Sequence, residues 1–266
     1  MTPRLDAALA ARGLARSRTH AASLIAQGLV SVDGRGVVKA STHVADDAAI
    51  EVAGADHYVS RAAHKLIGAL DAFEVDVTGR LALDVGASTG GFTQVLRERG
   101  ADPVIALDVG HGQLAASVAR DPGVIAIEGF NARDLSPDSL RAAAGIEALP
   151  SVVTGDLSFI SLSHVLEPIR TILAADADVV LLVKPQFEVG RTAVRGGLVT
   201  DAAARADAVT GVLWSAWDAG LGTLGVVSSP LLGTHGNAEF LAHFAAGRGS
   251  NPTEWLGTVS RLAGER

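Results

Sequence analysis

The alternation of apolar strands with helices between residues 81 and 228 is the feature that most restricts the fold of this chain. The predicted strands are apolar at consecutive positions, as strands are when both faces of a sheet are covered. Strands of this kind that alternate with helices form a doubly wound parallel sheet, so we expect one large α/β domain. The strands are expected at 81–85, 104–108, 124–128, 152–156, 179–184 and 222–228, and the helices at 60–73, 92–99, 113–119, 162–173 and 202–220.

A smaller domain is predicted before this sheet. Apolar residues at helical spacing, followed by glycines, indicate two short helices, and two short apolar segments indicate strands. These elements lie near residues 5–14, 22–25, 29–32 and 49–52. We expect a small α+β domain over residues 1–55, a linker over 56–59 and the large domain over 60–266.

The charge of the chain is unevenly distributed. The net charge is -7, yet residues 1–40 contain six Arg and Lys side chains against two Asp and Glu side chains. A basic module on an acidic body favours an anionic partner such as nucleic acid. A solvated basic helix face explains the same charges equally well, so charge alone leaves both interpretations open.

The composition excludes several kinds of chemistry and location. The chain has no cysteine, so it has no disulfide, no thiolate metal site and no cysteine nucleophile, and we expect no metal. The amino terminus lacks the apolar stretch of a secretory signal, and the longest aliphatic run, 179–183, is too short to span a bilayer. We therefore expect a cytoplasmic protein that does not associate with a membrane.

A glycine-rich loop over residues 84–91 (DVGASTGG) joins the first strand of the sheet to the following helix. Backbone amides in such a loop approach a ligand closely, and the helix presents its positive end to a carboxylate. The spacing of Gly86, Gly90 and Gly91 differs from the G-x-G-x-x-G fingerprint of dinucleotide-binding loops. With Asp84 at the end of the strand, the loop resembles that of S-adenosylmethionine-dependent methyltransferases.

The same cofactor predicts polar contacts after the next two strands. Asp108 ends the second strand, where its carboxylate can accept hydrogen bonds from ribose hydroxyls, and Asn131 and Ala132 follow the third strand at a place suited to adenine. Turn glycines and capping aspartates with a purely structural role are the alternative. The predicted cofactor-binding residues are Asp84, Gly86, Ala87, Ser88, Thr89, Gly90, Gly91, Phe92, Asp108, Asn131 and Ala132.

Four further residues, Lys65, Asp156, Lys184 and Glu239, form the candidate catalytic site. Asp156 and Lys184 end strands at the ligand-bearing edge of the sheet, and the other two lie in flanking segments that can reach it. A snorkelling lysine or a capping aspartate explains each residue taken alone. In this order, however, the four resemble the Lys-Asp-Lys-Glu tetrad of the FtsJ-type ribose 2'-O-methyltransferases. That resemblance makes Lys184 the proton acceptor or orienting group for a ribose hydroxyl, because an amine can lose a proton that a guanidinium keeps.

The segments 4–6 (RLD), 13–18 (GLARSR), 24–25 (LI), Gly28 and 32–34 (VDG) make the amino-terminal domain resemble an S4 RNA-binding domain. The resemblance implies that basic side chains from its helices contact the phosphates of structured RNA. An ordinary surface position is the alternative for each of these side chains. The candidate phosphate contacts are Arg4, Arg12, Arg16 and Arg18.

Four segments of the large domain extend the resemblance to nearly the whole chain. They are 60–66 (SRAAHKL), 86–92 (GASTGGF), 156–161 (DLSFIS) and 183–188 (VKPQFE). Together with the S4-like domain, they resemble the TlyA family. The resemblance implies S-adenosylmethionine-dependent 2'-O-methylation of cytidine in the RNA of the small ribosomal subunit, the large subunit or both, with ribosomal RNA or ribosomal subunits as partners.

Other functions have less support in the sequence. Methylation at carbon 5 of a base usually uses a cysteine nucleophile, which the chain lacks, and methylation of an exocyclic amine usually uses an Asp/Asn-Pro-Pro-aromatic loop, which residues 156–159 (DLSF) do not match. A membrane-lytic protein, as the haemolysin label of the family implies, needs a segment that spans or coats a membrane. The sequence shows no long apolar run and no long basic amphipathic helix that would do so. An RNA-binding module with an inactive methyltransferase core is the third alternative, although every cofactor and tetrad position is filled.

Overall fold

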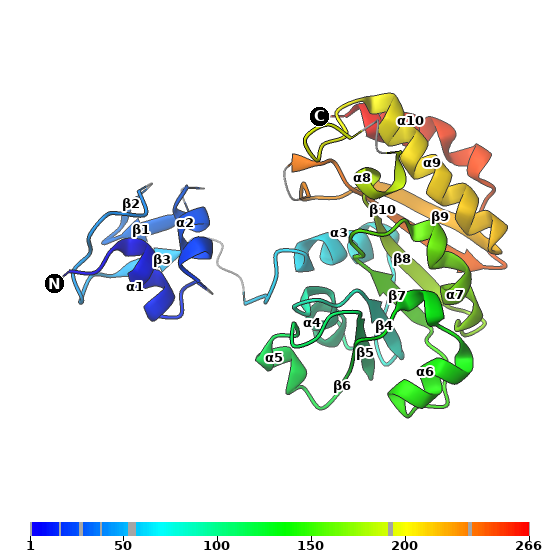
Figure 1. Cartoon of the computed structure of the whole chain (residues 1–266), viewed down its shortest axis with the longest axis horizontal. Coiled ribbons are helices and arrows are strands. Elements are labelled where there is room, and N and C mark those ends of the chain that lie inside the picture. The colour runs from blue at the N-terminus through cyan, green and yellow to red at the C-terminus, as the bar shows by residue number, and fades with distance from the viewer. Residues whose placement is uncertain are drawn as a thin grey trace. The chain divides into compact units, whose positions relative to one another are not determined.

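The computed structural model describes residues 2–15, 17–26, 29–37, 39–52, 57–190, 194–233 and 236–265. The chain divides into two compact units, Met1–His57 and Tyr58–Arg266 (Figure 1). The predicted domain limits at residues 55 and 60 stay a prediction, and residue 56 of the predicted linker lies outside the described residues.

Within the described residues, the amino-terminal unit consists of two helices and a small antiparallel sheet. The elements are α1 (Leu5–Ala11), α2 (Arg18–Ala26), β1 (Val30–Val32), β2 (Arg35–Gly36) and β3 (Ile50–Val52), and the strand order is β2-β1-β3. Leu5, Leu9, Ile25 and Val30 are buried together in its core. The sequence does not predict β2, because its two residues are exposed and carry no apolar pattern.

The described part of the large unit is built on a seven-stranded sheet, which confirms the predicted doubly wound α/β fold (Figure 1). The strand order is β6-β5-β4-β7-β8-β10-β9, and the strands from β6 to β8 are parallel. The strands are β4 (Ala82–Val85), β5 (Val104–Asp108), β6 (Val124–Glu128), β7 (Val152–Gly155), β8 (Asp178–Val183), β9 (Leu221–Ser228) and β10 (Phe240–Ala246).

Strand β10 corrects the expectation that the sheet is parallel throughout. It lies between β8 and β9 and runs antiparallel to both, with Phe240 opposite Val183 on one side and Ser228 on the other. The sequence does not predict this strand, because its segment (FLAHFAA) is apolar at nearly every position and fits a buried helix as well as a buried strand.

Helices cover both faces of the sheet. They are α3 (Ala63–Phe73), α4 (Gly91–Glu98), α5 (Ala116–Ala119), α6 (Pro137–Ala144), α7 (Leu166–Thr171), α8 (Pro185–Glu188), α9 (Ala202–Asp218) and α10 (Leu256–Gly264), with the 3-10 turns η1 (Ala132–Asp134), η2 (Leu162–His164) and η5 (Pro252–Trp255). The helix expected over 60–73 begins only at Ala63, and the one expected over 162–173 is divided into η2 and α7. The sequence analysis predicts neither α6 nor α10. No helix among the described residues combines the length and apolar character needed to cross a membrane.

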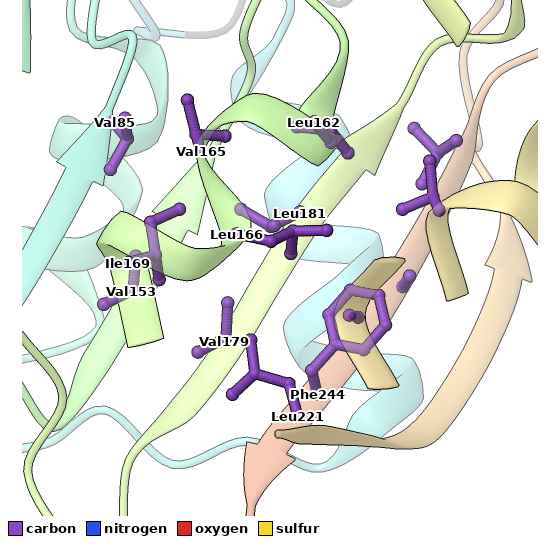
Figure 2. Close-up of a cluster of buried hydrophobic side chains, with 14 of the residues drawn as sticks. Val85, Val153, Leu162, Val165, Leu166, Ile169, Val179, Leu181, Leu221 and Phe244 are labelled. Atoms are coloured by element: carbon purple, nitrogen blue, oxygen red, sulfur yellow. The ribbon is translucent and has the colours of Figure 1, made fainter. Parts of the chain in front are cut away.

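Side chains alternate between two core layers along the strands. In β4, Leu83 faces the layer formed with α6, α7, α9 and α10, whereas Ala82 faces the layer formed with α3 and α4. Figure 2 shows the first layer, in which Leu181 of β8 lies beside Leu166 of α7, and Ile169 of α7 lies beside Val153 of β7. The strands are therefore buried on both faces, which explains their continuous apolar sequences.

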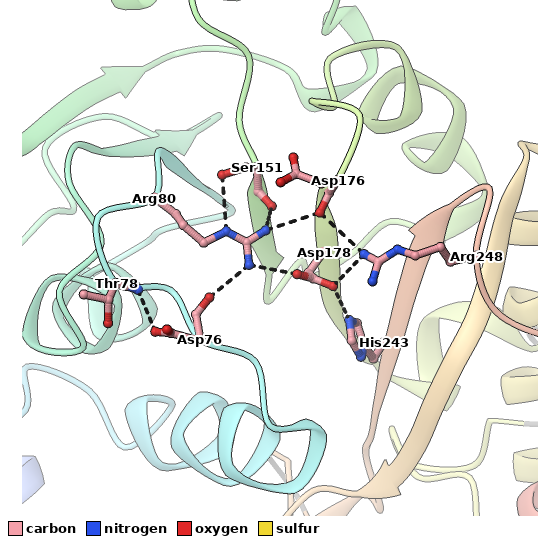
Figure 3. Close-up of polar contacts among 8 residues, drawn as sticks. All are labelled: Asp76, Thr78, Arg80, Ser151, Asp176, Asp178, His243 and Arg248. Atoms are coloured by element: carbon pink, nitrogen blue, oxygen red, sulfur yellow. Dashed lines mark hydrogen bonds and ion pairs between the residues drawn. The ribbon is translucent and has the colours of Figure 1, made fainter.

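A cluster of charged residues lies at the start of β8 (Figure 3). Asp178 accepts hydrogen bonds from Arg80 Nη1 at 2.8 Å and Arg248 Nη2 at 3.1 Å, and its Oδ1 lies 2.9 Å from His243 Nε2. Burial alone would raise the pKa of Asp178, but the contacts with His243 and Arg80 outweigh it and hold the pKa well below its usual range. This network stabilises the end of the sheet opposite to Lys184, which follows the end of β8.

Candidate active site

The candidate site lies where the order of the sheet reverses. Strands β4 and β7 are neighbours, and the following strands extend from them in opposite directions, so a crevice forms outside their carboxyl ends. The glycine loop follows β4, and Asp156 follows β7. Helix α4 begins directly after the loop, and its amino-terminal amides receive no side-chain cap from Gly90. These amides suit an anionic group of a ligand.

Close packing explains two glycines of the loop. Gly90 has a φ of 94°, and a Cβ atom on it would lie 2.8 Å from Leu114 Cδ1 and 3.0 Å from Val118 Cγ1. A Cβ atom on Gly91 would lie 2.9 Å from Ser60 Cβ. Any side chain at these positions would push the loop away from its neighbours, so glycine keeps the loop in place.

Two adjoining cavities open on the loop. The smaller one, of about 240 Å³, is lined by all four predicted catalytic residues, and the larger one, of about 590 Å³, is lined by Asp108, Asn131 and Ala132. Asp84 and Gly90 line neither cavity. The residues common to both linings are Gly86, Ser88, Asp156 and Ser158. The other loop residues in the lining of the smaller cavity are Ala87, Thr89, Gly91 and Phe92.

Lys65 and Glu239 form a buried ion pair. Lys65 Nζ lies 2.6 Å from Glu239 Oε2, and the two side chains are 7% and 2% exposed. Glu239 directly precedes β10, and Phe240 is paired with Val183 at the end of β8. Because β10 is antiparallel, its first residue lies at the edge where the parallel strands end, and this brings Glu239 to the site.

Lys184 and Asp156 form a second pair. Lys184 Nζ lies 2.6 Å from Asp156 Oδ1 and donates a hydrogen bond of 2.6 Å to Ser158 Oγ. Asp156 Oδ1 is buried and has no aligned hydrogen-bond donor among the described residues, so its contact with Lys184 is electrostatic rather than directional. The two residues follow the adjacent parallel strands β7 and β8. Strand pairing therefore places the Lys184 amine in the wall of the smaller cavity.

Asp84 lies beneath the glycine loop. It is fully buried, and its carboxylate accepts hydrogen bonds from Thr93 Oγ1 at 2.7 Å and Thr154 Oγ1 at 3.3 Å. Burial raises the pKa of Asp84 to about 7, and the nearby charge of Asp156 adds to the rise, while the threonine hydrogen bonds oppose it. Asp84 joins α4 to β7 below the loop, and its predicted contact with a cofactor stays a prediction.

An Asp84→Asn variant should change how the stability of the large unit depends on pH. The pKa of about 7 in the folded state lies above the ordinary value of 3.8, so between these values the folded protein holds a proton that unfolding releases. The wild type then loses up to about 4 kcal/mol of unfolding free energy from this group as the pH rises through that window, and the asparagine variant loses none.

Urea unfolding at several pH values between these two pKa values measures the effect. The chain has three tryptophans, Trp214, Trp217 and Trp255, and all belong to the large unit, so their fluorescence reports on it. The difference in unfolding free energy should move in favour of the asparagine variant as the pH rises. A difference that stays constant across the window would contradict the raised pKa.

Asp108 and Asn131 hold the backbone around the larger cavity. Asp108 accepts hydrogen bonds from Ser88 N at 2.8 Å and Gly110 N at 2.7 Å, and Asn131 Oδ1 accepts one from Arg133 N at 3.1 Å as the cap of η1. Both residues thus have a structural role and also line the cavity. Their contacts with ribose and adenine stay predictions.

Three of the four predicted RNA-binding arginines, Arg4, Arg12 and Arg18, have partners within the amino-terminal unit. Arg4 Nε and Arg18 Nη2 lie 3.1 Å and 3.0 Å from the two carboxylate oxygens of the buried Asp6. Arg12 donates hydrogen bonds to three carbonyl oxygens and so closes a loop, a structural role that the sequence does not reveal. Arg16 lies outside the described residues, and phosphate contacts of the other three stay predictions. The carbonyl oxygens bound by Arg12 belong to Ala45, Asp46 and Ala48.

Ser158, Arg61 and Phe159 are among the cavity-lining residues that sequence reasoning missed. Ser158 holds Lys184, Arg61 lines the smaller cavity, and Phe159 lines the larger one with 91% of its surface exposed and a φ of 64°. All three lie in segments that carry the family resemblance, but an exposed arginine or phenylalanine cannot be told from a buried one by pattern alone. An exposed aromatic ring near Lys184 offers a surface on which a nucleobase can stack.

Comparisons with known proteins cover both units. Residues 58–246 match the family of FtsJ-like methyltransferases, and residues 3–50 match the S4 domain. The 16S/23S rRNA (cytidine-2'-O)-methyltransferase TlyA of Mycobacterium tuberculosis (strain ATCC 25618 / H37Rv) is 49% identical over 240 residues, which are 89% of this chain and 87% of the relative. Hemolysin A of Brachyspira hyodysenteriae is 38% identical over 91% of this chain and 99% of its own. A solved structure from Streptococcus thermophilus, provisionally called a hemolysin, has a TM-score of 0.77 and 35% identity, over 98% of this chain and 95% of its own.

The structure is that of a methyltransferase with a Rossmann-like core, joined to an S4 domain. The features that define this class are the sheet whose strand order reverses at the site, the glycine loop and the two lysine-carboxylate pairs. The chain belongs to the FtsJ-like methyltransferase family and, within it, to the group of S4-containing proteins that includes TlyA.

Proposed function

We propose that this chain transfers a methyl group from S-adenosylmethionine to the 2'-oxygen of a cytidine ribose in 16S ribosomal RNA, 23S ribosomal RNA or both. The observation that carries the proposal is the cavity in which Lys65, Asp156, Lys184 and Glu239 lie together beside the glycine loop. The printed activity of the Mycobacterium relative supports cytidine and ribosomal RNA as the substrate. The S4 domain supports RNA as the partner.

The residues around the two cavities fit S-adenosylmethionine. A Cβ atom on Gly86 would lie 3.3 Å from the carbonyl oxygen of Asp156, so the glycine keeps open the place where the cavities meet. The amides at the start of α4 suit the carboxylate of the methionine group, and Asp108 and Asn131 suit ribose and adenine. This cofactor, when bound, supplies the electrophilic methyl group. Its proposed contacts in the cavity walls are Gly86, Ala87, Ser88, Thr89, Gly91, Phe92, Asp108, Asn131 and Ala132.

Lys184 is the proposed proton acceptor or orienting group for the ribose hydroxyl. Such a hydroxyl is a poor nucleophile near neutral pH, so it needs alignment and help with its departing proton. Asp156 and Ser158 hold the Lys184 amine, each at 2.6 Å. The buried Lys65–Glu239 pair gives the same cavity a rigid wall. The chain thus supplies an oriented amine within a preformed pocket.

Incubation with tritiated S-adenosylmethionine and ribosomal particles that lack this modification tests the proposal. The particles are 30S subunits, 50S subunits and 70S ribosomes, separated after the reaction. We expect tritium in the RNA of at least one subunit, and reverse-transcription stops at low nucleotide concentration should map it to the ribose of a cytidine. The Lys184→Arg protein serves as the negative control.

Two results would overturn this function. One is the absence of transfer to any particle by folded protein that binds the cofactor. The other is lysis of red blood cells by purified, cofactor-free protein, which would favour the membrane-lytic activity suggested by the names of two relatives.

A further inference from the structure

The segments that follow β7 and β8 contact each other along their length. These are the Asp156 segment (residues 156–161) and the Lys184 segment (residues 184–188), and their first residues form the 2.6 Å ion pair of the site. Further along, the ring centroids of Phe159 and Phe187 lie 5.2 Å apart. The two segments therefore form a paired wall rather than two independent loops.

Glu188 joins the far ends of this wall. Its Oε2 accepts a hydrogen bond from Ser161 Oγ at 2.6 Å, and its Oε1 accepts one from Leu162 N at 3.0 Å. Ser161 also caps η2 by accepting a hydrogen bond from Ser163 N at 3.2 Å. Glu188 thus fixes the point at which the Asp156 segment turns into η2.

Glu188 is partly buried, and this partial burial disfavours the charged form of its carboxylate. It raises the pKa of Glu188 above its ordinary value, and the hydrogen bonds from Ser161 and Leu162 only partly offset this rise. The proposed methyl transfer uses neither Glu188 nor Ser161 in direct contact with the substrate, so their strong mutual hydrogen bond calls for another role.

We propose that Glu188 is a positioning residue, which sets the placement of Lys184 against Asp156 by fixing the far ends of the segments that carry them; this rests on the proposed function. Lys184 and Glu188 are joined by α8, a single helical turn in which Phe187 N donates a hydrogen bond of 2.9 Å to Lys184 O. A turn this short has little conformational freedom, so a displacement of Glu188 also displaces Lys184.

Steady-state methylation of ribosomal RNA by Glu188→Ala and Glu188→Gln tests this role. The alanine variant should lower kcat by about 10- to 100-fold, because displacement of a reacting group by about 1 Å costs that much. KM for RNA and Kd for the cofactor should change by less than about threefold, because the hydrogen bonds of Glu188 lie outside both cavity linings. The glutamine variant should keep kcat within about threefold, since its amide accepts from Leu162 N and donates to Ser161 Oγ.

Two further variants control the experiment. Glu167→Ala removes an exposed carboxylate from the neighbouring α7 and should leave kcat unchanged. Ser161→Ala removes one of the two hydrogen bonds that Glu188 accepts and should lower kcat by about 3- to 10-fold. If melting curves show that Glu188→Ala does not fold, the kcat of Ser161→Ala tests the positioning role in its place.

An active wild type with equal kcat in Glu188→Ala would overturn the inference while leaving the proposed function intact. Equal losses of kcat in the alanine and glutamine variants would also overturn it, because they would show that kcat depends on the charge of Glu188 rather than on its hydrogen bonds. A wild type that methylates no ribosomal RNA would overturn both the function and the inference.

Discussion

A Lys184→Arg variant should lose methyl transfer by about a thousandfold or more while binding S-adenosylmethionine as the wild type does. The Lys184 amine is buried, with Asp156 Oδ1 and Ser158 Oγ each 2.6 Å away, and the longer, branched side chain of arginine does not place a nitrogen at the same point. Arginine also keeps its proton at every pH at which proteins fold. Single-turnover transfer of tritium measures the rate, and calorimetric titration measures the cofactor affinity.

Lys39→Arg is the matched control for this change. Lys39 is an exposed lysine of the amino-terminal unit, and with Lys65 and Lys184 it completes the three lysines of the chain. Its replacement should leave kcat unchanged. Turnover retained by Lys184→Arg would refute the proposed role, and loss of cofactor binding in that variant would place Lys184 in the binding of the cofactor instead.

A Glu239→Ala variant should lower the unfolding free energy of the large unit by about 3 to 5 kcal/mol, because it leaves the Lys65 ammonium in a buried site without its carboxylate. Urea unfolding followed by tryptophan fluorescence measures the loss. The same variant should also lose most of its methyl transfer, since Lys65 and Glu239 line the cavity that holds Lys184.

A double variant separates the charge effect from the loss of packing. Lys65→Met combined with Glu239→Leu removes both buried charges and should recover most of the stability, because apolar side chains of similar volume replace a buried ion pair at little cost. Glu147→Ala is the control: Glu147 lies 3.3 Å from Arg141 but is 93% exposed, and its loss should cost less than about 1 kcal/mol. A double variant as unstable as Glu239→Ala would contradict this account.

The parallel strands and the glycine loop are predictable because their causes are local. A strand that is buried on both faces needs apolar residues at consecutive positions, which is visible in β4, β5 and β8. A loop that turns back with a positive φ at Gly86 and Gly90 needs glycine, whatever the rest of the chain does. The structure therefore contains both features as the sequence predicts them.

Strand β10 and the roles of the arginines are not predictable in this way. The apolar segment of β10 fits more than one structure, and its position between β8 and β9 depends on pairing with both of these strands, which its own sequence does not specify. Arg12 looks like a surface cation in the sequence, yet its guanidinium binds carbonyl oxygens that lie more than 30 residues further along the chain.

The sequence by itself determined the class of sheet and the glycine loop, because these follow from local pattern and residue type. It indicated Lys65, Asp156, Lys184 and Glu239 as a candidate set only through their resemblance to the tetrad of the FtsJ-type methyltransferases. Only the tertiary structure decided that Lys65 pairs with Glu239 and Lys184 with Asp156, and that Asp84 lies buried below the loop rather than in a cavity wall. The partner and the burial of a charge depend on contacts between distant segments, and the Lys65 and Glu239 side chains meet across 174 positions of sequence.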